Sequence, residues 1–67
     1  MKRYAIACVF SKPKEGATSI QAILNIFEGE NEDEARGKAV ANGFKALDDG
    51  YSLFLRPLIM EVPEKDE

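Results

Sequence analysis

The sequence predicts an α+β fold: a single small ββαβ domain in which one helix packs on one face of a three-stranded antiparallel sheet. Three observations support this prediction. Residues 4–10 form an uncharged apolar run, residues 18–27 alternate between two side-chain sets, and residues 31–47 show helical spacing between two turn signals. The 67 residues have room for one domain, which we place at residues 1–63, followed by a charged C-terminal tail at residues 64–67.

The first strand is predicted at residues 4–10. Seven uncharged residues, rich in β-branched and aromatic side chains, are typical of a strand that is covered on both faces. Successive side chains of a strand point to opposite faces. One face therefore carries Tyr4, Ile6, Cys8 and Phe10, and the other carries Ala5, Ala7 and Val9. Residues 11–17 contain Pro13 and Gly16 among charged residues, so we expect a connecting loop there.

The second strand is predicted at residues 18–27. One of its two side-chain sets is wholly apolar and is expected to face the helix: Ile20, Ala22, Leu24 and Ile26. The other set combines amides with apolar side chains and is expected on the uncovered face: Gln21, Ile23, Asn25 and Phe27. This assignment gives the more apolar set to the core, where such side chains are most often found.

The helix is predicted to begin after Asn31. The side-chain oxygen of Asn31 can accept a hydrogen bond from a first-turn amide, and Glu34 three residues later completes a capping-box pattern. Small and apolar residues then recur at helical spacing: Ala35, Ala39, Val40, Gly43, Phe44 and Leu47. Asn42-Gly43 is an alternative stop, but the spacing continues beyond it, so we expect the helix to end near Leu47, before the turn signal at residues 48–50.

The third strand is predicted at residues 51–62, with an interruption at Arg56-Pro57. Proline lacks the amide hydrogen that a sheet ladder requires, so this strand is expected to be an edge strand or to bend there. The uncharged first strand suits the centre, which gives the strand order 2-1-3 with antiparallel neighbours. A right-handed crossover then places the helix on one face of the sheet.

Composition excludes several classes of function. The chain has nine basic and twelve acidic side chains, a formal net charge of -3, no histidine and one cysteine. The acidic balance argues against a general nucleic-acid binder, and a single thiol without histidine provides neither an internal disulfide nor a zinc ligand set. No apolar run approaches the ~20 residues of a membrane span. The apolar run that ends at Phe10 lacks a small-residue cleavage site, so we expect no signal peptide and a cytoplasmic location.

No residue pattern in the chain points to catalysis, a metal or a cofactor. Cys8 lies among apolar residues without a histidine base, which favours a core cysteine. The acidic residues around the predicted helix start lack the spacing of a calcium loop and suit the positive end of the helix dipole. We therefore expect a protein that is not an enzyme and has no catalytic, metal or cofactor-binding residues.

The uncovered face of the sheet is the candidate functional surface. A single copy would expose more apolar area there than soluble monomers tolerate, so we expect a homo-oligomer, most simply a two-fold dimer through this face or a sheet edge. The third strand contributes either Tyr51, Leu53, Leu55 and Ile59 or Phe54, Leu58 and Met60 to this face. The alternative is that loops or the chain from Val62 onward cover it. The expected interface residues are Ala5, Ala7, Val9, Ile23, Phe27, Tyr51 and Arg56.

The expected function is binding. The layout is similar to that of many short bacterial and phage proteins, and the concrete hypothesis is a phage or mobile-element accessory protein that inhibits or sequesters a host component. One alternative is a binder of a small metabolite or nucleotide, with pockets at the subunit interface. Another is a nucleic-acid binder, because the first fourteen residues contain no acid and four bases. These bases form the candidate anion rim: Lys2, Arg3, Lys12 and Lys14.

Overall fold

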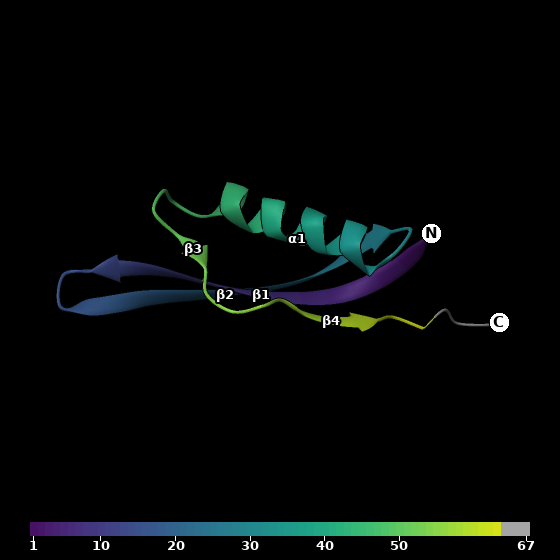
Figure 1. The fold of residues 1–67 in the computed structure, drawn as a ribbon, viewed down its shortest axis with the longest axis horizontal. Helices are drawn as coiled ribbons and strands as arrows, with labels where there is room; N and C mark the ends of the chain where they lie inside the picture. Colours follow the sequence, from purple (N-terminus) through teal and green to yellow (C-terminus); the bar gives the residue numbers. More distant parts are fainter. Residues whose placement is uncertain (64–67) are drawn as a thin grey trace.

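The structure, a computed structural model, describes residues 1–63, so the predicted tail at residues 64–67 lies outside the described residues. The elements are β1 (Lys2–Lys14), β2 (Ala17–Gly29), α1 (Glu32–Ala46), β3 (Ser52–Leu53) and β4 (Leu58–Glu61). The strand order is β2-β1-β3, and β4 also pairs with β1. All pairs are antiparallel, and α1 lies on one face of the sheet (Figure 1). The predicted fold is confirmed, with the third strand present as two segments on either side of Arg56-Pro57.

β1 and β2 form one long hairpin with an uninterrupted register from Lys2 opposite Gly29 to Lys14 opposite Ala17. Glu15 and Gly16 make the turn, and Gly16 has a φ of 73°, which glycine adopts without steric strain. The loop predicted at residues 11–17 is therefore wrong, since most of these residues extend the two strands. The hairpin projects beyond the helix (Figure 1), and the molecule is 52 Å long.

Pro13 fits inside β1 because its nitrogen faces no neighbouring strand. The amide of Phe54 donates to the Val9 carbonyl, and the amide of Val62 donates to the Arg3 carbonyl. Odd-numbered residues of β1 therefore turn their backbone groups toward β3 and β4. Pro13 has the same parity, and the pairing of β3 with β1 ends at Ser11, so no ladder bond is lost at the proline.

The start and end of α1 agree with the prediction. The Asn31 side-chain oxygen accepts a hydrogen bond from the Glu34 amide at 2.9 Å. The carboxylate of Glu34 reaches back and accepts from the Glu30 amide, one residue before the cap. At the other end, the Leu47 amide donates to the Gly43 carbonyl at 3.1 Å. The helix thus continues through Asn42-Gly43, as the spacing of its apolar residues indicates.

The core lies between β1 and α1. Its buried side chains are Tyr4, Ile6, Cys8, Phe10, Ala35 and Ala39. Gly43 is also buried, and a Cβ at this position would overlap the ring of Phe10. The Phe10 ring also meets the Phe44 ring edge-on, with centroids 5.1 Å apart. Small residues on α1 therefore let the helix lie close to the large side chains of the central strand.

Candidate interaction surface

The register of the hairpin decides which side chains of β2 share a face with the core. Residues directly opposite each other in an antiparallel pair lie on the same face. Ile23 is opposite Cys8 and Phe27 is opposite Tyr4, so both lie on the covered face, where they pack against the core. The prediction that Ile23 and Phe27 lie on the uncovered face is wrong.

The set predicted to face the helix lies instead on the uncovered face: Ile20, Ala22, Leu24 and Ile26. The more apolar set of β2 does not face the helix, because β2 is an edge strand that α1 covers only in part. Its helix-side amides, Gln21 and Asn25, remain exposed and need no apolar partner. The two-residue turn at Glu15-Gly16 determines which side chains of β2 share a face with the core side chains of β1, since a turn of known length sets the register of a hairpin.

The pairing of β3 and β4 selects between the two sets left open for the third strand. Leu58 lies opposite Ala7, Met60 lies opposite Ala5, and the Phe54 amide bonds to the carbonyl of Val9. These three side chains therefore belong to the uncovered face.

Tyr51 lies on the covered side, not the uncovered one. It packs beside the core, and its hydroxyl is 2.7 Å from the Ser19 hydroxyl. The ammonium of Lys12 lies 5.4 Å from the centre of its ring. Arg56 is exposed in the segment between β3 and β4. Of the predicted interface residues, the structure therefore brings together only the three from β1.

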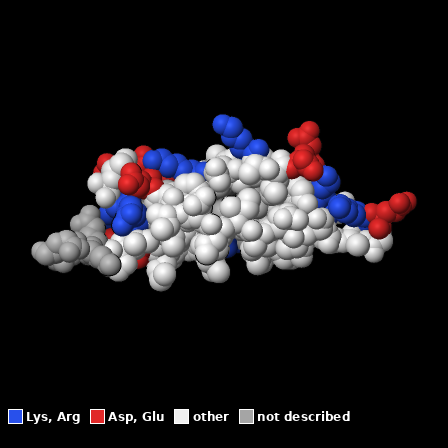
Figure 2. Space-filling view, turned by 180° about the vertical axis from the view of Figure 1, so that it is seen from behind, with Lys and Arg blue, Asp and Glu red and all other residues white. Residues whose placement is uncertain are grey.

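We call the uncovered surface the open face. It consists of Ala5, Ala7, Val9, Ile20, Ala22, Leu24, Ile26, Phe54, Leu58 and Met60. Leu24 and Leu58 are each 73% exposed, so the loops of the described chain, through residue 63, do not cover this surface. Figure 2 shows the charged side chains gathered along the helix side and at the two ends of the molecule, with an uncoloured stretch between and below them.

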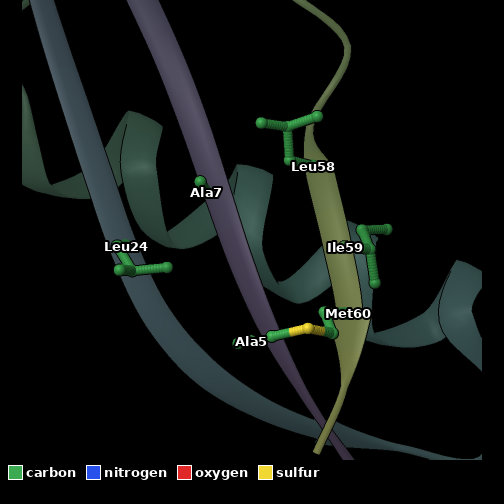
Figure 3. A pocket seen from close by; sticks show the side chains of 6 residues that line it. All are labelled: Ala5, Ala7, Leu24, Leu58, Ile59 and Met60. Carbon is green, nitrogen blue, oxygen red and sulfur yellow. The ribbon is translucent and has the colours of Figure 1, made fainter.

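A shallow apolar groove runs along the middle of the open face. Its floor is formed by Ala5 and Ala7 of β1 (Figure 3). Its walls are formed by larger side chains of the neighbouring strands: Leu24 from β2, and Leu58 and Met60 from β4. Ile59 of β4 also lines the groove, but it lies opposite Ile6 and its side chain packs against the core on the other face. The hollow has a volume of about 200 Å³. Short side chains on the central strand between long ones on its neighbours produce a shape that can accept an apolar side chain from a partner.

The candidate anion rim is not one surface. Lys2 and Arg3 lie at the start of β1, whereas Lys12 and Lys14 lie at its other end beside the turn. At ~3.3 Å per residue, Arg3 and Lys12 are about 30 Å apart along the strand. The four bases therefore form two separate pairs.

The acidic residues at the start of α1 and the single cysteine are the remaining candidates. Asp33 accepts a hydrogen bond from the Arg36 guanidinium at 2.6 Å, one helical turn away, in an exposed pair that adds little stability. Burial raises the pKa of the Cys8 thiol from the ordinary value of 9.0, so the thiol is neutral at pH 7. Within residues 1–63, no cluster of three or more histidine, cysteine or acidic side chains could hold a metal ion.

The described helix α1 is neither long nor apolar enough to cross a membrane. No protein-family model, curated protein or solved structure matches the chain.

Proposed function

We propose that the protein is a non-enzymatic interaction module that acts as a homo-oligomer, in which the open faces of two copies pack together. The supporting observation is an uncharged surface with six large apolar side chains that are each at least half exposed. Fully burying one such side chain contributes about 1.5–3 kcal/mol. Burying the surface therefore contributes several kcal/mol, which is comparable with the ~5 kcal/mol stability of a small domain.

A second copy of the chain is the occupant that the shape of the open face favours. Packed sheets lie ~10 Å apart, with their inward side chains interdigitated. In a two-fold contact, the large side chains of one copy enter the groove of the other copy. The symmetry repeats the same contact with the two copies exchanged. The alanine floor at Ala5 and Ala7 has room for a leucine from the facing sheet, and Leu24 and Leu58 stand beside that floor.

The test is the mass of the protein in solution at micromolar concentration, measured by light scattering or sedimentation. We expect two copies or a multiple of two. Leu58→Glu, which places a charge in the centre of the open face, should lower the mass by a factor of two or more. Leu55→Glu is the matched control, because Leu55 is also more than half exposed but lies in the segment between β3 and β4. A wild-type mass of 7.4 kDa, that of one chain, would contradict the proposal.

A small-ligand binder is the second candidate, because the groove is apolar and lies at the proposed subunit boundary. Its volume of about 200 Å³ is below the ~300–1,000 Å³ of drug-sized ligand pockets, so the second copy would have to close it. Mass spectrometry of the gently purified oligomer tests this candidate. A co-purifying small molecule that is lost in Leu58→Glu would support it, whereas an oligomer of protein alone would reject it.

A further inference from the structure

The two edges of the sheet are built differently. One edge consists of β3 and β4, which have two and four residues and are separated by Arg56-Pro57. Short strands, proline and charged side chains are the usual means by which proteins prevent an edge from pairing with another strand. The other edge is β2, with 13 residues in unbroken register with β1. From Ala17 to Phe27 it contains neither a charge nor a proline.

The outward backbone groups of β2 belong to its even-numbered residues. Even-numbered residues of β1 point toward β2, and their partners in β2 are odd-numbered, as in the pair Cys8 and Ile23. Two hydrogen bonds agree with this parity. The Ile26 amide donates to the side chain of Asn25 at 3.1 Å, and the ammonium of Lys38 donates to the Glu28 carbonyl at 2.7 Å.

Side chains of the protein itself therefore satisfy outward groups at one end of the β2 edge. Farther along, the outward amides and carbonyls of four residues have no hydrogen-bond partner within residues 1–63: Thr18, Ile20, Ala22 and Leu24. Each residue offers one donor and one acceptor at strand spacing. Two of these four residues precede Gln21 and two follow it at equal spacing. In an antiparallel arrangement of two copies about Gln21, the donors of each copy therefore face the acceptors of the other.

We propose that the β2 edges of two copies pair antiparallel through residues 18–24, with Gln21 on the two-fold axis. Ile20 of one copy then lies opposite Ala22 of the other, and Thr18 lies opposite Leu24. In this register, the outward amides and carbonyls of Thr18, Ile20, Ala22 and Leu24 all bond to the other copy. The pairing ends before Ile26, whose outward amide already donates to the Asn25 side chain. The contact goes beyond the proposed function, because it uses backbone groups of the β2 edge and not the side chains of the open face.

The two contacts are compatible in space. A two-fold axis that joins antiparallel strands within one sheet is perpendicular to the sheet, so both helices lie on one side and both open faces on the other. Edge pairing therefore produces one continuous sheet with a wider apolar surface, which remains free to pack against another sheet.

A disulfide test reports the register directly. Gln21 would form a non-hydrogen-bonded pair with its own copy, with Cα atoms ~4.5 Å apart, which lies within the span of a disulfide. We expect Gln21→Cys to give a covalent dimer under mild oxidation, while the buried Cys8 takes no part. Thr18→Cys is the control, since Thr18 is also exposed on β2 but would lie ~20 Å from its copy. Equal rates of cross-linking in the two variants would overturn the proposal.

Amide hydrogen exchange separates the edge contact from the open-face contact. The measurement is made on Leu58→Glu, whose substitution lies on β4, away from the β2 edge. We expect slow exchange at Ile20 and Ala22, whose amides point outward, as well as at Ser19 and Ile23, which pair with β1. Fast exchange at the two even-numbered residues beside slow exchange at the odd-numbered ones would reject edge pairing and leave the open-face proposal untouched. Protection that requires an added extended peptide would reject the second copy as the occupant.

Discussion

The two faces of the sheet have similar side-chain chemistry and opposite surroundings. On the covered face, Ile6 and Phe10 have no exposed surface. On the open face, Leu24 and Leu58 are each 73% exposed. A domain with a single helix can cover only one face of its sheet. The comparison shows that the helix and the register, and not the hydrophobicity of a strand, decide which apolar residues form the core of a single copy.

The largest expected difference between the faces comes from truncating one side chain on each. Phe10→Ala should lower the free energy of unfolding by ~3–5 kcal/mol, because it leaves a cavity under α1. Leu58→Ala should change the unfolding of a single copy by no more than ~0.5 kcal/mol, because its side chain is already in water. Urea denaturation at a protein concentration low enough to give monomers measures both values. Similar losses in the two variants would remove the distinction between the faces.

The close approach of α1 to the covered face is tested by two glycine substitutions. Gly43→Ala should be destabilising. Overpacking against Phe10 costs ~1–3 kcal/mol, whereas the higher helix propensity of alanine contributes only ~1 kcal/mol of stability. Gly37→Ala is the matched control, since nothing lies within 4 Å of a Cβ there. It should stabilise the protein by up to ~1 kcal/mol. Thermal unfolding midpoints should therefore shift in opposite directions, and two shifts of the same sign would contradict the close packing.

The cap of α1 supports the covered face from one end. Asn31→Ala should lower the free energy of unfolding by ~1 kcal/mol, because the Glu34 amide loses its acceptor. Asn42→Ala, in the exposed middle of the helix, is the control and should have no comparable cost. Urea midpoints of the two variants measure the difference. An Asn31→Ala midpoint equal to that of the wild type would mean that the cap adds nothing to the stability of the helix.

The smallest expected effect is a dependence of stability on pH. Because burial raises the pKa of Cys8 above 9.0, the folded chain holds the thiol proton more tightly than the unfolded chain. This contribution is fully present below pH ~9 and is lost as the pH rises through the folded pKa. The free energy of unfolding, measured from pH 7 to 10, should fall more steeply in the wild type than in Cys8→Ala. Parallel curves would show that the thiol is not buried in the fold.

The sequence predicts where the helix and the strands lie along the chain better than it predicts which side chains of a strand face the helix. The Asn31 cap, the parity of β1 and the break at Pro57 each depend on local chemistry, and the structure agrees with all three. The parity of β2 could not be read from composition, because both of its side-chain sets contain large apolar residues. The length of the hairpin does not follow from the sequence, because a proline among charged residues is typical of a loop. In the structure, the nitrogen of Pro13 faces no neighbouring strand, so the strand continues through it.

The two methionines provide the most direct test of whether the open face is buried between copies. Met1 and Met60 are equally exposed in a single copy, at 68%, but only Met60 belongs to the open face. Methyl NMR with a soluble paramagnetic probe reports the access of solvent to each methyl group. If two copies bury the open face, the Met60 methyl should be strongly protected from the probe and the Met1 methyl should not. Equal relaxation of the two methyl groups at micromolar concentration would show that the open face stays in water.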